Sequence, residues 1–305
     1  MSFIDKALER AKALRPKPEK GMPPRPQATP PLKEPQEPSP KTWGESVPAD
    51  SICYSATKTV PVDHEVLKRH RLIAWETGGP IVEEYKLVRI HILQRTKAES
   101  RNTLMVTGAL PDEGKTLTAI NLAISMSQEL DQTVLLVDAD LRSPSVHQYF
   151  GLPQGLGLVD YLKYGTPIPE LLVHPRGLAK LVLLLGGQPV TEAAELINSQ
   201  QMAELVHELK HCYQDRYVLF DLPPILSYAD GLAFSRLVDG IVLVVEAGRT
   251  PREKISQCLE LLKDLPVLGL ILNKADNLPS EHYLREYQKA EPPILKKKRK
   301  FPWFR

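Results

Sequence analysis

From about residue 80 onward, short apolar runs alternate with longer segments whose apolar residues recur at helical spacing. The apolar runs are rich in Val, Ile and Leu and predict strands at 103–108, 133–140, 180–187, 217–224, 240–248 and 267–276. Apolar runs without polar alternation are typical of strands that are buried on both faces of a sheet. Helical spacing predicts helices over 81–94, 115–129, 199–214 and 250–265.

This alternation predicts an α/β fold with a doubly wound, mostly parallel sheet and helices on both faces, because parallel strands need crossover connections. We expect this domain to span residues 80–290. A pre-domain segment at 51–79 precedes it, and a basic, aromatic tail at 291–305 follows it. The sequence shows no internal repeat.

The first 50 residues differ in composition from the rest of the chain. Residues 1–15 place apolar side chains on one helical face after the capping pair Ser2 and Asp5, which predicts a short amphipathic helix. Residues 16–50 are rich in proline and poor in apolar residues, so we expect a disordered linker there. The helix either folds back on its own domain or docks on another protein or a membrane surface.

Composition and charge argue against several classes of protein. A net charge of +2 and a pI near 8.3 do not fit a strongly basic nucleic-acid-binding protein, so we expect no nucleic-acid partner. No apolar run reaches the roughly 18 residues of a membrane helix, and no secretory signal is visible, so we expect a cytoplasmic chain. Cys53, Cys212 and Cys258 lack the spacing of a zinc or redox site.

The stretch MVTGALPDEGKTLTAI at 105–120 has the form of a phosphate-binding loop between a strand and a helix. Ala109 takes the first glycine position, and Gly114, Lys115 and Thr116 follow at the required spacing. Lys115 is expected to neutralise phosphate charge, and the Thr116 hydroxyl is expected to hold Mg²⁺. The predicted nucleotide contacts in the loop are Asp112, Glu113, Gly114, Lys115, Thr116 and Leu117.

Carboxylates follow two of the predicted strands. Asp138 and Asp140 end the run TVLLVDAD, and Asp221 ends YVLFD. Because the carboxyl ends of parallel strands bind ligands, we expect these acids near the phosphate loop, with a cation between them. The alternative for Asp138 and Asp140 is a pair of solvated loop acids or caps.

In this order, the loop PDEGKT, the motif VDADLR and the strand ending DLPP resemble the bacterial tyrosine kinases of capsule and exopolysaccharide machineries. These kinases are relatives of the MinD/ParA ATPases, and the resemblance spans about residues 60–275. It implies a P-loop NTPase fold of the MinD/ParA-like type. The N-terminal helix, proline linker and PVDHEVLKRHRLIAW further resemble the subgroup found with exosortase-type polysaccharide loci.

The resemblance implies a role for each site residue. Lys115 and Thr116 would bind ATP and Mg²⁺, and Asp138 would accept or orient the proton of the tyrosine hydroxyl. Asp140 and Asp221 would complete the metal shell. Asn273 would approach the base.

The resemblance also implies partners. Glu83, Lys86 and Arg89 match the family's Glu-x-x-Arg-x-x-Arg oligomerisation helix, with Lys at the middle basic position, which weakens the case for a ring. A membrane-embedded activator of the polysaccharide co-polymerase type and a cognate tyrosine phosphatase are further implied partners. The chain would then be peripheral at the inner membrane through that activator.

The C-terminal part differs from the family's tyrosine cluster, because only Tyr283 and Tyr287 are present as phosphoacceptors. Spaced four residues apart, the two tyrosines would lie on one side of a helix, which fits a structural role as well as a role as phosphorylation substrates. The final KKKRKFPWFR fits either contact with an anionic membrane or a solvated tail.

Three functions are compatible with these motifs. The first is an ATP-dependent protein-tyrosine autokinase that regulates exopolysaccharide or capsule assembly. The second is a MinD/ParA-like switch ATPase, which typically carries an extra lysine early in the loop; residues 109–113 contain none, which favours the kinase. The third, an inactive scaffold, is disfavoured because the lysine, the threonine and all three acids are present.

Overall fold

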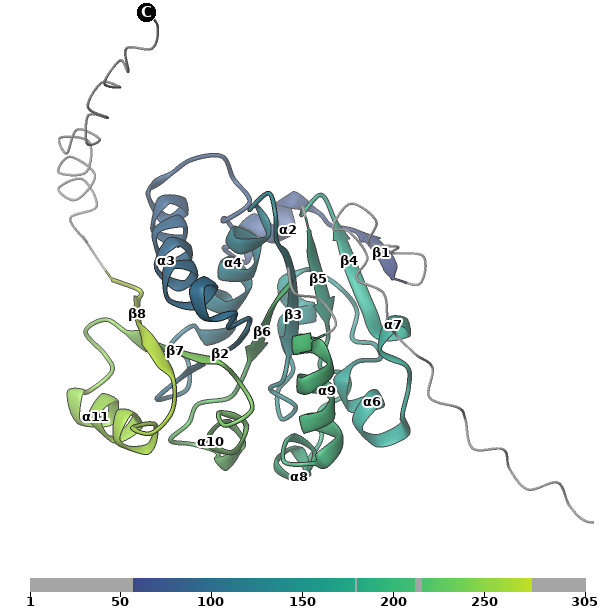
Figure 1. Ribbon diagram of the computed structural model, residues 1–305. Coiled ribbons are helices and arrows are strands. Elements are labelled where there is room, and N and C mark those ends of the chain that lie inside the picture. The colour runs from purple at the N-terminus through teal and green to yellow at the C-terminus, as the bar shows by residue number, and fades with distance from the viewer. Residues whose placement is uncertain (1–56, 179, 212–215, 276–305) are drawn as a thin grey trace, which may run out of the picture. The chain divides into compact units, whose positions relative to one another are not determined.

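The computed structural model describes residues 57–178, 180–211 and 216–275. In this part of the chain, one eight-stranded sheet runs in the order β1-β4-β5-β3-β6-β2-β7-β8 (Figure 1). The strands are β1 (Lys58–Pro61), β2 (Thr103–Gly108), β3 (Thr133–Asp138), β4 (Leu172–Arg176), β5 (Leu181–Leu184), β6 (Arg216–Asp221), β7 (Gly240–Glu246) and β8 (Val267–Asn273). Neighbouring strands are parallel except β4 and β5. The predicted mostly parallel sheet is confirmed.

Helices cover both faces of the sheet (Figure 1). One face carries α2 (His64–Arg69), α3 (Pro80–Thr96), α4 (Lys115–Ser127) and α5 (Val146–Tyr149). The other face carries α6 (Leu158–Tyr164), α7 (Ile168–Leu171), α8 (Ala193–Ile197), α9 (Gln200–His211), α10 (Ala229–Phe234) and α11 (Arg252–Leu261). A short 3₁₀ helix, η3 (Lys97–Glu99), follows α3.

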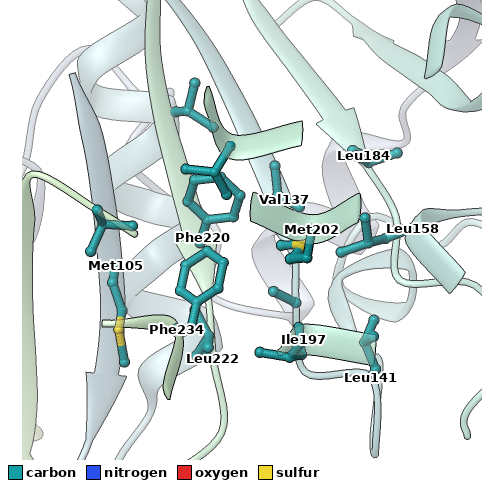
Figure 2. Close-up of a cluster of buried hydrophobic side chains, with 14 of the residues drawn as sticks. Met105, Val137, Leu141, Leu158, Leu184, Ile197, Met202, Phe220, Leu222 and Phe234 are labelled. Atoms are coloured by element: carbon teal, nitrogen blue, oxygen red, sulfur yellow. The ribbon is translucent and has the colours of Figure 1, made fainter. Parts of the chain in front are cut away.

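The central strands are buried on both faces, as their apolar runs predict. In β2, Leu104 and Val106 pack in the core beneath α4, whereas Met105 packs in the opposite core. Figure 2 shows this second core, where the rings of Phe220 and Phe234 meet at an interplanar angle of 60°, with their centroids 4.9 Å apart. Apolar residues at successive positions therefore stabilise opposite sides of one sheet.

The long predicted elements are present with small shifts at their ends, but the edge strand β1 and its neighbour β4 were not predicted. The β4 sequence LVHPR contains a histidine, a proline and an arginine, so it lacks the apolar run that marks the central strands. The segment 57–79 belongs to the same fold, since β1 pairs with β4 and the side chains of Leu67 and Leu72 are fully buried. The expected boundary at residue 80 is therefore not the start of the sheet.

Several expectations fall outside the described residues. These are the N-terminal helix at 1–15, the linker at 16–50, the tail at 291–305, and the candidate phosphoacceptors Tyr283 and Tyr287. Within the described ranges, none of the helices combines the length and the apolar character that spanning a bilayer requires.

Asn121 of α4 holds the segment between α2 and α3 against α4. Its Oδ1 accepts the backbone N–H groups of Ile73 at 2.9 Å and Ala74 at 3.1 Å. Its Nδ2 donates to the carbonyls of Arg71 at 3.0 Å and Leu117 at 3.1 Å. Because the Asn121 side chain is buried, the groups that it satisfies have no ready replacement by solvent.

We expect Asn121→Ala to lower the free energy of unfolding by about 3 kcal/mol, because the buried N–H of Ala74, the half-buried N–H of Ile73 and the carbonyl of Arg71 lose their partner. Urea denaturation of the full chain measures this change. The matched control is Asn198→Ala, which removes an exposed side chain that bonds only to the carbonyl of Ala194. A loss no larger than that of the control would show that Asn121 does not anchor this segment.

Candidate active site

The carboxyl ends of β2, β6 and β3 lie side by side, and the candidate site residues follow them. Asp138 is paired in register with Asp221 across β3 and β6, and Asp221 is also paired with Val106 of β2. The phosphate loop leaves β2 after Gly108 and enters α4 at Lys115. The predicted convergence of the loop and the strand-end carboxylates is therefore present in the structure.

The phosphate loop makes a tight turn into α4. Gly114 adopts φ +86°, and a Cβ there would lie 2.2 Å from Asn273 Nδ2, so only glycine fits without a shift. Lys115 Nζ donates to the carbonyl of Leu110 at 2.9 Å, which curls the side chain back over the loop. Glu113 Oε2 accepts the Leu110 N–H at 2.8 Å from within the same turn.

The three strand-end carboxylates are held differently. Asp138 Oδ2 accepts the N–H groups of Ser145 at 2.9 Å and Val146 at 3.0 Å at the start of α5. Asp140 Oδ1 accepts the Ser143 N–H at 3.1 Å. Asp138 is buried, so it is not a solvated loop acid, but its two bonds at the start of α5 are those of a cap, which is the other alternative considered for Asp138 and Asp140.

Burial and mutual repulsion shift the ionisation of these groups. Burial raises the pKa of Asp138 to about 7, and the nearby charge of Asp140 adds to the rise. Burial, reinforced by the charge of Asp138, holds the pKa of Asp221 well above its usual range. Burial also raises the pKa of Asp140. For Lys115, burial lowers the pKa, while the neighbouring carboxylates, Asp221 foremost, oppose that shift.

Some carboxylate oxygens at this site have no hydrogen-bond partner in the part of the chain that the structure describes. Among the described residues, Asp138 Oδ1 and both oxygens of Asp221 are buried with no hydrogen-bond partner. The Thr116 hydroxyl lies close enough to Asp221 to oppose the rise of its pKa, although hydrogen-bonding geometry is not reached. Buried anions without partners are costly, so these oxygens fit a site for a cation or for donor groups of a ligand.

A metal ion at this site would need ligands from outside the protein. In the described ranges, no group of three or more His, Cys, Asp or Glu side chains is arranged to hold a metal by itself. The residues fit Mg²⁺ only if the Thr116 hydroxyl, a carboxylate, water and a phosphate share its coordination, which is the common arrangement for Mg²⁺ with a nucleotide.

A second set of polar residues touches the phosphate loop from the side of β7 and β8. Asn273 Nδ2 donates to the carbonyl of Glu113 at 2.9 Å, and Lys274 Nζ donates to that of Asp112 at 2.6 Å. Thr250 Oγ1 donates to Glu113 Oε1 at 2.7 Å. Sequence reasoning named Asn273 but missed Thr250 and Lys274. Their position just after two strands of the same edge was the available signal.

The candidate oligomerisation residues lie on α3, away from the carboxylates. Lys86 pairs with Glu83 at 2.7 Å on the helix surface. Arg89 pairs with Glu129 at 2.9 Å and donates through Nη1 to the carbonyl of Ser125 at 2.6 Å, so both contacts bind it to the end of α4 in its own chain.

The isolated thiol Cys258 is buried; Cys53 and Cys212 lie outside the described residues.

Residues 104–298 match the family model of the CobQ/CobB/MinD/ParA nucleotide-binding domain. The chain is 36% identical over 193 residues to the tyrosine-protein kinase YwqD of Bacillus subtilis (strain 168), covering 63% of this chain and 80% of YwqD. It is 31% identical over 210 residues to the succinoglycan biosynthesis transport protein ExoP of Rhizobium meliloti (strain 1021), covering 68% of this chain but only 26% of ExoP.

A solved structure extends the likeness to three dimensions. The kinase domain of the Escherichia coli tyrosine kinase ETK matches with a TM-score of 0.62 at 26% identity, over 72% of this chain and 92% of that domain. The family model covers well over half of the chain, and the match to YwqD covers most of that kinase. The chain therefore belongs to the CobQ/CobB/MinD/ParA nucleotide-binding family and, within it, to the bacterial tyrosine kinases.

Proposed function

We propose that this chain is an ATP-dependent protein-tyrosine autokinase that acts in exopolysaccharide or capsule biosynthesis or export. The observation that carries the proposal is the cluster of strand-end carboxylates at the phosphate loop. Asp138 and Asp221 are buried with three oxygens unpaired among the described residues, and Lys115 lies near Asp221 and Asp140. Mg²⁺ bound with a triphosphate would offset negative charge on both the carboxylates and the phosphates, and Lys115 would add one further positive charge. ATP and Mg²⁺ are the proposed substrate and cofactor.

Positioning and charge neutralisation account for most catalysis of phosphoryl transfer. Lys115 would cross the loop to the β- and γ-phosphates, while the N–H groups at the start of α4 point at the same oxygens. Thr116, Asp140 and Asp221 would hold Mg²⁺, directly or through water. Bound there, Mg²⁺ would offset the charge that develops on the transferred group. Asn273 lies beside the loop and would border the base.

Asp138 is the proposed proton acceptor. Two backbone N–H groups fix its Oδ2, which leaves Oδ1 free for the tyrosine hydroxyl. As the tyrosine oxygen bonds to the γ-phosphorus, the bond to the β–γ bridging oxygen breaks, ADP departs, and the hydroxyl proton passes to Asp138. A carboxyl group whose pKa lies near neutrality is suited to accept and release this proton.

The remaining assignments rest on family likeness. Tyr283 and Tyr287 are the proposed phosphoacceptors, modified in trans by a neighbouring subunit. Glu83, Lys86 and Arg89 are the proposed oligomerisation residues. A membrane-embedded activator would hold the chain at the inner membrane, a phosphatase would reverse the modification, and the tail at 291–305 would add contact with anionic lipid.

We expect Lys115→Met to reduce transfer from labelled ATP to tyrosine by at least about 100-fold, because it removes the cation that neutralises the phosphates. Mass spectrometry of the full chain, incubated with ATP and Mg²⁺, locates the phosphotyrosine, which we expect at Tyr283 or Tyr287. Lys254→Met, which alters an exposed lysine bonded only to Gln257, is the matched control. ATP hydrolysis without any phosphotyrosine would identify a switch ATPase instead.

Asp138 makes the nucleotide-free protein sensitive to pH. Its folded-state pKa of about 7 lies above the ordinary 3.8, so ionising it costs stability as pH rises between those values. Asp138→Asn keeps an oxygen for the two N–H donors and removes the charge. We expect this variant to melt about 5 °C above the wild type at pH 8, with no gain at pH 4.

Thermal melts without nucleotide at both pH values measure this difference. Asp264→Asn, at an exposed position, provides the control and should change neither melt. An equal change in Tm at pH 4 and pH 8 would mean that the ionisation of Asp138 is not the cause.

A further inference from the structure

Two backbone carbonyls of the phosphate loop accept hydrogen bonds from side chains at the carboxyl end of β8. Lys274 Nζ donates to the carbonyl of Asp112 at 2.6 Å, and Asn273 Nδ2 donates to that of Glu113 at 2.9 Å. Asn273 is the last residue of β8 and Lys274 follows it, whereas the loop follows β2. The contacts therefore join segments about 160 residues apart in the chain.

These contacts set the direction of the loop's N–H groups. In a planar trans peptide, the carbonyl and the N–H of the next residue point in opposite directions. When Lys274 and Asn273 hold the carbonyls of Asp112 and Glu113 toward β8, the N–H groups of Glu113 and Gly114 point away from β8. Those are two of the N–H groups expected to meet phosphate.

The backbone of this contact is strained at both ends. Asp112 adopts φ +63° and Lys274 adopts φ +55°, values that non-glycine residues rarely take. The hydrogen bond between Lys274 Nζ and the Asp112 carbonyl joins the two strained positions. Strain of this kind costs about 1–3 kcal/mol per residue and persists only where surrounding contacts hold it.

A buried carboxylate completes the connection. The Glu113 side chain is 2% exposed, although a negative charge beneath a phosphate-binding loop would repel the ligand. Both its oxygens are occupied, one by the Leu110 N–H and one by the Thr250 hydroxyl. Thr250 Oγ1 in turn accepts the Glu246 N–H at 2.9 Å, which ties Glu113 to the end of β7.

Glu246 also fixes the lysine. Lys274 Nζ lies 3.1 Å from Glu246 Oε2, and the Glu246 side chain is only 14% exposed. A partly buried partner limits the movement of an otherwise exposed ammonium group. The loop, the end of β7 and the end of β8 thus form one connected network of hydrogen bonds.

We propose that Lys274 and Thr250 are positioning residues which, with Glu113 and Asn273, hold the phosphate loop in its phosphate-binding conformation before nucleotide arrives. This role rests on the proposed nucleotide site, but it does not require tyrosine phosphorylation. The four residues are named the loop clamp. The loop clamp acts on the phosphate end of the ligand, so its loss weakens binding of phosphate groups with or without a base attached.

Displacement of a fluorescent ADP analogue from the full chain, in Mg²⁺, by ADP and by inorganic pyrophosphate tests the loop clamp. Lys274→Met keeps the length of the side chain and loses the ammonium, and Thr250→Val keeps the shape and loses the hydroxyl. We expect each to weaken binding of both ligands by about tenfold. Lys274→Arg and Thr250→Ser should bind within about threefold of the wild type, and Lys254→Met serves as control.

Both substitutions act on the same loop. The affinity of the double variant Lys274→Met/Thr250→Val should therefore fall by less than the product of the two single-variant fold-changes. If both single variants bind pyrophosphate as the wild type does but bind ADP more weakly, the loop-clamp proposal is wrong. Lys274 would then contact the base. If the wild-type chain binds both ligands but forms no phosphotyrosine, the kinase proposal is wrong and the loop-clamp proposal stands. A wild-type chain that binds neither ligand would overturn both.

Discussion

Negative charge buried at one edge of the sheet is the constraint on which the rest of the site depends. Asp138 and Asp221 stand opposite each other in register at the ends of β3 and β6. Both strands are buried on both faces, so solvent cannot reach these carboxylates from either side of the sheet. Lys115 supplies one positive charge near Asp221, but burial still raises the pKa of Asp138 and Asp221 above the usual range.

The parallel topology explains why the charge gathers there. The order β3-β6-β2 places three strand ends together, although their sequence positions are far apart. The same topology brings the ends of β7 and β8 to the loop from the other side, where Thr250, Asn273 and Lys274 contact it. The carboxylates thus lie on one side of the phosphate loop, and Thr250, Asn273 and Lys274 lie on the other. A group of acids suited to a cation therefore adjoins a loop whose backbone is fixed by hydrogen bonds.

Much of this arrangement could be predicted from sequence because it follows local patterns. Apolar runs identified the central strands, and the loop spacing identified Lys115 and Thr116. The edge strand β1 and its neighbour β4 lack that pattern, and their pairing depends on neighbours that local sequence does not specify. Asn121 looked like one polar position in a helix. Its four hydrogen bonds reach mainly to a turn nearly 50 residues away, and no spacing rule detects such a contact.

The α3 motif shows how tertiary structure changes the meaning of a sequence motif. Arg89 lies at the carboxyl end of α4, where a cation is favoured by the helix dipole, and it binds Ser125 and Glu129 there. The opposite end of α4 carries Lys115 and Thr116. A neighbouring subunit that engaged Arg89 would have to replace these contacts at one end of the helix whose other end carries the proposed phosphate contacts. Assembly through this motif would therefore act on the same helix that the phosphate loop enters.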